Sequence, residues 1–210
     1  MLKTIENNYG TIQMKKIIII FLAIMMQQTF AQENTLFSSG EYSSGGFGGP
    51  VLKYTTLNDQ GSMLIGGRGG WIINHSLILG GGIYGLATNV TVDVIDGDMI
   101  YPDADKLHLM YGGFEFEYIF SPLNVFHISL YALLGAGNAF YLNVFEENHN
   151  MGKTFFVAEP AINFEVNVTN YFHLAAGVSY RYTNGANYQA ISDPNVSGFN
   201  GMLTFKFGKF

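Results

Sequence analysis

One pair of side chains in the sequence combines a nucleophile and a base at close spacing. His127 and Ser129 lie two residues apart in the segment His-Ile-Ser. Acyl transfer by a serine needs a histidine within hydrogen-bonding distance and a carboxylate that orients the imidazole. No acidic residue completes such a set nearby, so we predict that the protein is not an enzyme. With no cysteine in the chain, thiol catalysis, thiolate metal sites and disulfides are excluded.

A cluster of carboxylates forms a second candidate site, in the polar segment 89–106. Ca²⁺ takes six to eight oxygen ligands, which clustered carboxylates can supply. The spacing matches no EF-hand loop, so we expect a solvated acidic loop and keep a calcium site as the alternative. The residues concerned are Asp93, Asp96, Asp98, Asp103 and Asp105.

Three histidines stand at the beginnings of predicted strands and could suggest a metal site. They are His75, His127 and His173, on the third, fifth and seventh segments of alternating polarity. Alternate strands of a sheet lie about 9–10 Å apart, whereas zinc binds each ligand at about 2 Å. We therefore predict no metal and no cofactor.

The amino terminus has the pattern of a secretory signal peptide. Lys15 and Lys16 precede an uninterrupted apolar run over 17–26, and Ala31 supplies the small residue expected before a cleavage site. The run is too short for a spanning helix, which needs about 20 residues. We predict a signal peptide over 1–31 with the true start at Met14, a short leader over 32–45, and one domain over 46–210.

The composition of the remainder favours an all-β domain. The chain has 26 glycines, 15% aromatic residues and only 12% charged residues, with a formal net charge of −6 that disfavours nucleic acid as a partner. Period-two alternation predicts eight strands, each long enough to span a bilayer. Their ranges are 47–57, 62–73, 76–88, 107–120, 125–141, 154–168, 171–183 and 198–210.

The connections between these strands alternate between short turns and long polar loops. Turns at 74–75, 121–124 and 169–170 are tight, whereas 89–106, 142–153 and 184–197 are long. Outer-membrane barrels sort their connections in this way, with the short turns in the periplasm. The pattern predicts an eight-stranded antiparallel up-and-down barrel that crosses a membrane.

The phase of the alternation supports a membrane location. The segment around Phe114 and Phe116 places aromatic rings on one face and Glu115 and Glu117 on the other. The interior of an eight-stranded barrel is just wide enough for side chains, so we expect the apolar rows to face lipid. We also expect two local features: a bulge at Pro160, which cannot donate to a ladder, and either strong local curvature or close packing on Tyr84 at 80–82.

Four positive and four negative residues stand at positions that are predicted to face the barrel interior. Charges in a narrow low-dielectric interior must be paired, so we predict an ion-pair network that fills the lumen; a conduit or gate for a small ion is the alternative. The network residues are Lys53, Arg68, Glu115, Glu117, Glu159, Glu165, Arg181 and Lys206.

The carboxyl-terminal strand carries a family resemblance. A closing strand that ends in an aromatic residue, Phe210, behind a signal peptide resembles the assembly signal of bacterial outer-membrane barrels, and the mature chain resembles the small eight-stranded OmpA/OmpX-like group. The run 66–76 is similar to segments of uncharacterised barrels from Bacteroidetes-type bacteria. His127-Ile-Ser129 resembles the His-x-Ser of lipid A deacylases, but Tyr141 stands where their acid follows.

This resemblance implies a Gram-negative outer-membrane location and insertion by the barrel-assembly machinery, but it implies no activity. We expect a non-catalytic barrel with long extracellular loops that contact outer-membrane lipid, lipopolysaccharide or a protein partner in a membrane complex. A narrow pore or passive facilitator is the alternative, and a lipid-modifying enzyme is disfavoured. Besides the aspartates, the predicted binding residues of the loops are Tyr101, Phe145 and Tyr188.

Overall fold

The computed structural model describes residues 43–96, 99–140, 153–187 and 192–210, with 94–96 and 99–105 described by their backbone alone. The predicted signal peptide and most of the leader lie outside these residues. The described elements are β1 (Ser44–Leu57), β2 (Gln60–Ile73), β3 (Leu77–Leu86), β4 (Thr91–Asp96), β5 (Met99–Lys106), β6 (His108–Phe120), β7 (Phe126–Phe140), β8 (Lys153–Thr169), β9 (Phe172–Asn184), α2 (Asp193–Val196) and β10 (Gly198–Lys209).

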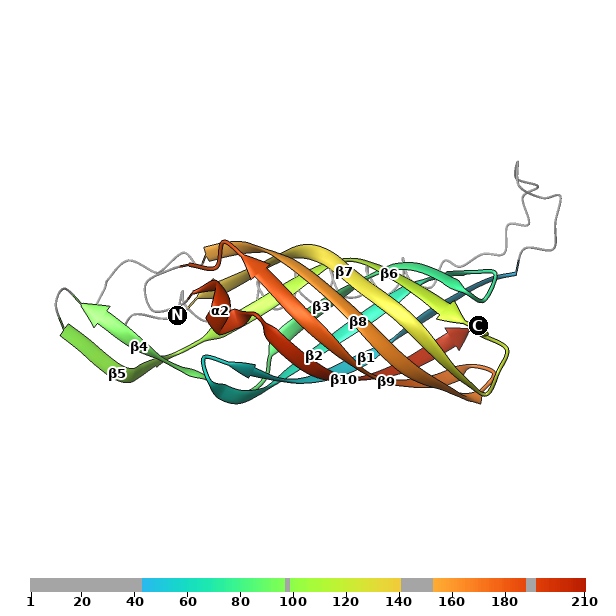
Figure 1. Ribbon diagram of the computed structural model, residues 1–210, viewed down its shortest axis with the longest axis horizontal. Coiled ribbons are helices and arrows are strands. Elements are labelled where there is room, and N and C mark those ends of the chain that lie inside the picture. The colour runs from blue at the N-terminus through green and yellow to red at the C-terminus, as the bar shows by residue number, and fades with distance from the viewer. Residues whose placement is uncertain (1–42, 97–98, 141–152, 188–191) are drawn as a thin grey trace, which may run out of the picture. The chain divides into compact units, whose positions relative to one another are not determined.

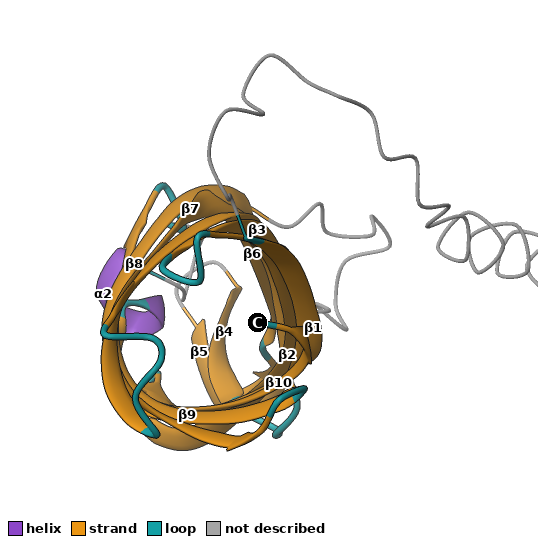
Figure 2. Ribbon diagram, turned by 90° about the vertical axis from the view of Figure 1, so that its right-hand side faces the viewer, coloured by secondary structure: helices purple, strands orange, loops and turns teal. Residues whose placement is uncertain are grey.

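Eight of these strands close into one antiparallel barrel. The order around the barrel is β1-β10-β9-β8-β7-β6-β3-β2, and β1 closes the ring by pairing with both β2 and β10. Each strand runs obliquely to the long axis, and Figure 2 shows the closed ring from one end. The predicted fold class is confirmed, and the eight predicted strands correspond to the eight barrel strands.

The two ends of the barrel differ in their connections. At one end, named here the turn end, short connections join β2 to β3, β6 to β7 and β8 to β9, and the carboxyl terminus lies beside them. The other end, named the loop end, carries the longer connections and the tight turn Asn58-Asp59. Asn58 and Asp59 both have positive φ, as the type I′ turn of a two-residue hairpin requires.

Regular structure at the loop end was not predicted. Segment 89–106, expected as a polar loop, forms the β4–β5 hairpin, which extends beyond the barrel wall (Figure 1). The segment 184–197 contains helix α2, whose Val196 is buried. No helix among the described residues is long and apolar enough to cross a membrane.

The outward face of the barrel is apolar. Along β6 the rings of Phe114, Phe116 and Tyr118 are about half exposed, whereas the intervening Glu115 and Glu117 are buried. β8 repeats this alternation, with Ile162 and Phe164 exposed on either side of Asn163. The predicted phase therefore holds, and large hydrophobic side chains cover the outside of the barrel wall.

The inward face has polar side chains in its middle and apolar ones at its ends. A small cluster of Phe47, Ile72, Ile78 and Ile119, with Phe210 against it, lies at the turn end. A larger cluster, which includes Leu57, Val90, Leu107 and Val196, lies toward the loop end. The buried charged residues lie in contact with both clusters, since Phe47 of the small cluster lies against Arg68 and Tyr84 of the larger one bonds to Glu115.

The predicted bulge at Pro160 is wrong. β8 keeps one register with β7 through Ala132↔Pro160, and the β8–β9 register is the same on both sides of this residue. Around Pro160 the ladder to β9 skips Glu159 and Pro160, so one interruption of pairing accommodates the missing N–H. The irregularity of β8 lies instead between Asn167 and Thr169.

Glycines allow two close approaches inside the wall. Gly82 leaves room for the carboxylate of Glu115 and the hydroxyl of Tyr84, as the predicted packing of 80–82 on Tyr84 requires. Gly113 on β6 pairs directly with Gly135 on β7, and a Cβ on Gly135 would overlap the backbone carbonyl of Gly112. Backbone atoms cannot yield as a flexible side chain can.

We therefore expect Gly135→Ala to destabilise the barrel by about 1–3 kcal/mol, the usual cost of overpacking. Gly201→Ala is the matched control, because a Cβ there has open space around it. Urea unfolding of the two variants, refolded in detergent micelles, measures the difference. Equal stability of both variants would show that β6 and β7 are not so closely apposed.

Candidate functional site in the barrel lumen

All eight charged residues predicted for the lumen are buried in it. They project from six of the eight barrel strands, so residues far apart in sequence meet in the barrel axis. The structure arranges them as two groups at different heights. The group nearer the turn end, named the turn-end network, contains Arg68, Glu115, Glu117, Glu165 and Lys206.

The turn-end network is a chain of alternating charges. The Arg68 guanidinium contacts Glu115 at 2.7 Å and Glu117 at 3.0 Å. Lys206 Nζ lies 2.9 Å from Glu117 and 2.7 Å from Glu165. Every cation in this group therefore bridges two carboxylates, which offsets the cost of removing them from water.

Hydroxyl groups supply further hydrogen bonds to the same carboxylates. Tyr84 and Tyr131 each donate to Glu115 Oε1 at 2.7 Å. Ser129 Oγ lies 2.5 Å from Glu117 and 2.6 Å from Glu165. Sequence analysis did not select the tyrosines, although their inward phase on β3 and β7 was a usable signal.

The second group, named the loop-end network, consists of Lys53, Glu159 and Arg181. Lys53 Nζ lies 2.7 Å from Glu159 Oε1 and 3.5 Å from the centre of the Tyr84 ring, a cation–π contact. Glu159 also accepts hydrogen bonds from Tyr111 at 2.7 Å and Ser179 at 2.6 Å. Tyr111 and Ser179 were likewise missed by sequence analysis.

Arg181 departs from the predicted arrangement, because it makes no ion pair among the described residues. Its guanidinium donates to the backbone carbonyl of Val196 at 2.7 Å and to Asn200 Oδ1 at 3.0 Å. The amide of Asn200 in turn contacts Glu159 at 3.4 Å. Dipoles of neutral groups therefore solvate this buried cation, and helix α2 supplies one of them.

The two networks carry opposite formal charges. The turn-end network has two cations and three carboxylates, hence −1 with neutral histidines, and the loop-end network has two cations and one carboxylate, hence +1. The lumen as a whole is neutral. Its charge is nevertheless polarised along the barrel axis, with the negative excess toward the turn end.

The His127 and Ser129 pair is not assembled for acyl transfer. Ser129 Oγ donates to carboxylates and not to the imidazole. His127 faces Glu165 instead, with Nε2 and Oε2 3.5 Å apart. The sequence did not indicate this carboxylate, because Glu165 lies on another strand. Its presence does not create a hydrogen bond between Ser129 and His127, which acyl transfer would need.

From the spacing of alternate strands we predicted that the histidines lie too far apart to bind one metal ion. This argument is wrong for two of the three histidines. His127 on β7 and His173 on β9 both point into the lumen, where their ring centroids are 6.2 Å apart. Curvature of the wall brings inward side chains closer than their strands are. With Glu165 from β8 between them, their ligand atoms lie within 4.8 Å of one another.

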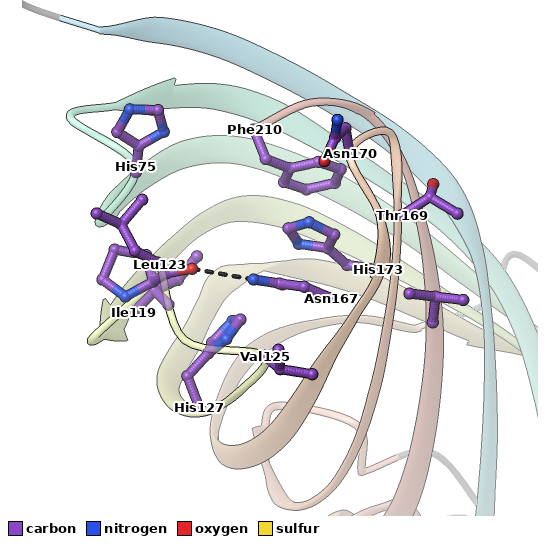
Figure 3. Close-up of a pocket in the computed structure, with 12 residues that line it drawn as sticks. His75, Ile119, Leu123, Val125, His127, Asn167, Thr169, Asn170, His173 and Phe210 are labelled. Atoms are coloured by element: carbon purple, nitrogen blue, oxygen red, sulfur yellow. Dashed lines mark hydrogen bonds between the residues drawn. The ribbon is translucent and has the colours of Figure 1, made fainter.

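A cavity of about 440 Å³ opens beside these histidines at the turn end (Figure 3). His75, His127 and His173 all line it, with Asn167 and Leu123 from the adjoining strand and turn. The ring of Phe210 stacks on His173 at a centroid distance of 3.5 Å. The final residue therefore packs at the mouth of the lumen.

The predicted loop sites fall largely outside the described side chains. Asp93 is exposed near the base of the β4–β5 hairpin. The backbone places Asp96 on β4, and Tyr101, Asp103 and Asp105 on β5. Asp98, Phe145 and Tyr188 lie outside the described residues, so the calcium alternative stays a prediction.

Comparison with known proteins identifies the fold. No family model and no curated protein matched the chain. Neisserial surface protein A (NspA) is a solved structure with 14% identity, a TM-score of 0.52, and coverage of 81% of this chain and 100% of that one. The fold of this chain is thus that of a small eight-stranded outer-membrane barrel.

Two further solved structures cover this chain to a similar extent. The N-terminal β-barrel domain of Pseudomonas aeruginosa OprF has 14% identity and a TM-score of 0.46, with coverage of 79% of this chain and 96% of that one. Ail of Yersinia pestis, in complex with the heparin analogue sucrose octasulfate, has 17% identity and a TM-score of 0.43, with coverage of 80% and 99%.

Removal of one member of the turn-end network should strongly destabilise the protein. We expect Arg68→Ala and Glu117→Ala each to lower the free energy of unfolding by about 3–5 kcal/mol, because each leaves an uncompensated buried charge. Lys209→Ala, at an exposed lysine, should stay within about 0.5 kcal/mol of wild type. Urea titrations in detergent micelles compare the three variants, and wild-type stability in both network variants would refute the network.

Proposed function

We propose that this protein is a non-catalytic outer-membrane barrel with a closed lumen, whose loop end has a structural or interaction role at the cell surface. The observation that carries the proposal is the combination of an apolar outer wall with a charge-filled interior. An apolar outer wall is stable when lipid surrounds it. A filled interior leaves the two ends of the barrel as the surfaces that can bind other molecules.

The outer wall supports membrane residence. Large exposed side chains such as Ile65, Phe114, Leu134 and Phe164 would be costly in water but favourable in hydrocarbon. Closure of the barrel leaves no sheet edge exposed to lipid, as a membrane-spanning sheet requires. Trp71 and Phe126, exposed near the turn end, suit the aromatic girdle at a membrane interface.

The orientation that suits this architecture has the turn end in the periplasm and the loop end outside the cell. Lipid and lipopolysaccharide would then surround the wall, and the barrel-assembly machinery would insert it, with Phe210 in the assembly signal. The aspartates and aromatic residues of the loops would be available to a surface ligand or a protein partner. Rigid scaffolds that carry variable loops commonly place binding there.

The filled lumen argues against the pore alternative. The two networks fill the middle of the interior, and apolar side chains pack among them and toward both ends. Wide aqueous channels need about 16 strands or more.

We therefore expect no stepwise conductance when the refolded protein is reconstituted into planar lipid bilayers. A large porin added to the same bilayer is the positive control for the recording. Reproducible steps that scale with the amount of barrel would refute the closed lumen and favour the pore.

The loop-end role can be tested with a shortened hairpin. Replacing residues 94–103 by Asn-Gly should leave a two-residue turn on the β4–β5 stem while keeping the buried Val90, Val92 and Leu107. Helix α2 must stay, because Val196 packs in the core and binds Arg181.

We expect the shortened variant to fold as wild type does but to migrate as a lone barrel in native electrophoresis of mildly solubilised outer membranes. Wild type should migrate in a larger complex. A complex that persists without the tip would refute this role for the hairpin, and a lone barrel in both would refute the interaction role itself.

A further inference from the structure

Several buried polar atoms among the described residues have no hydrogen-bond partner, and three of them belong to neighbouring residues at the turn end of the lumen. These three are Nε2 of His127, Nδ1 of His173 and Oε2 of Glu165. All three residues are more than nine-tenths buried, with exposed fractions of 5%, 6% and 0%. Buried polar groups are normally paired, since an unpaired one costs about 1–3 kcal/mol. Three such atoms pointing toward one place call for a common partner.

We propose that His127, Glu165 and His173 form a binding site for a divalent transition metal, with Zn²⁺ as the reference ion. Two imidazoles and one carboxylate are ligands that zinc accepts in proteins. Their ligand atoms lie within 4.8 Å of one another. This site is separate from the loop-end surface and does not depend on the role proposed for it.

The strand register places the three ligands. His127 on β7 and Glu165 on β8 are directly paired, and His173 on β9 pairs with Asn167, two residues further along β8. The 3.5 Å between His127 Nε2 and Glu165 Oε2 is close to the edge of a tetrahedron around zinc, about 3.4 Å for bonds of about 2.0–2.1 Å. The ligand atom offered by His173 lies within 4.8 Å of the other two.

Neighbouring groups orient all three ligands. Nδ1 of His127 lies 3.3 Å from the backbone carbonyl of Asn124, so a proton held there leaves the lone pair of Nε2 free. Glu165 divides its two oxygens, since Oε1 accepts from Lys206 and Ser129 while Oε2 faces the histidines. Phe210 packs flat against the His173 ring. Metal-binding imidazoles and carboxylates commonly have such outer partners.

The local charge favours a cation. The turn-end network carries −1 when the histidines are neutral, and Glu165, a ligand of the site, is joined to Glu117 through Lys206. Lys206 opposes a cation, but its ammonium group already lies against both of these carboxylates. The 440 Å³ cavity lined by the two histidines leaves an entry path and room for a water as the fourth ligand (Figure 3).

A proton shared between His127 and Glu165 is the competing explanation of their 3.5 Å contact. It would satisfy two of the three atoms and leave Nδ1 of His173 unpaired. A metal ion satisfies all three. The two explanations differ in a measurable way, because only the second predicts a defined metal stoichiometry.

The test is calorimetric titration of the refolded full-length mature barrel, without a histidine tag, with zinc chloride in detergent micelles. We expect one zinc per barrel in wild type. His127→Gln and His173→Gln should each weaken binding by at least about tenfold, because loss of even an outer-shell partner of a metal ligand has an effect of that size. Heat-modifiable gel mobility verifies that each variant is folded.

Two other histidines provide matched controls. His75→Gln alters the same cavity outside the cluster, and His108→Gln alters a histidine that stacks on Phe140 near the loop end. Both should bind zinc as wild type does. Absence of stoichiometric zinc in wild type, or equal binding in the cluster and control variants, would overturn the proposal.

Zinc X-ray absorption on the wild-type protein makes the result independent of whether the variants fold. A first shell of two imidazole nitrogens with oxygen ligands supports the site. A shell of oxygen alone, as for zinc held by the acidic loop or by lipid, overturns it.

Discussion

The architecture depends on one constraint: charges in an eight-stranded lumen have no room for water and must find partners on other strands. The cations of the turn-end network meet this constraint by bridging. Arg68 on β2 joins two carboxylates of β6, and Lys206 on β10 joins β6 to β8. The contacts cross the barrel, so they act as interior braces between parts of the wall that share no backbone ladder. Register errors would separate them, and the network thereby favours one arrangement of the strands.

The same constraint directs function away from the interior. In the described part of the chain, braced charges and apolar side chains fill the lumen, which supports the proposal that it conducts no solute, and the apolar wall suits contact with lipid. What remains for recognition are the two ends, and they are unlike. The loop end has a hairpin that stands clear of the wall and a helix turn held by Arg181. The turn end has a recessed cavity lined by histidines.

Sequence periodicity was sufficient for the barrel because the two faces of its wall have different solvents. Alternation such as Phe114-Glu115-Phe116-Glu117 assigns each side chain to lipid or lumen without knowledge of its neighbours. It gave no information on which lumen residues meet, since that depends on strand tilt and on the curvature of the wall. For this reason periodicity predicted an ion pair for Arg181 that the structure does not have. For the same reason, strand spacing predicted that the rings of His127 and His173 lie too far apart to bind one metal ion. The hairpin at 91–106 was missed because its polar composition is typical of a loop, and Pro160 was overinterpreted because one missing donor needs only a gap in pairing.

The opposite charges of the two networks connect the buried interior with its ends. Near the loop end, the excess positive charge resides on Arg181, whose guanidinium is solvated by Asn200 and by the carbonyl of Val196 in α2. Near the turn end, the excess negative charge resides among three carboxylates, and His127 and His173 lie beside one of them, Glu165. A neutral imidazole carries no charge, so these rings do not offset the excess as Asn200 and the carbonyl of Val196 solvate Arg181. A cation held by the imidazoles and Glu165 would offset it, and the metal site proposed at the turn end would therefore balance the network that lies beside it.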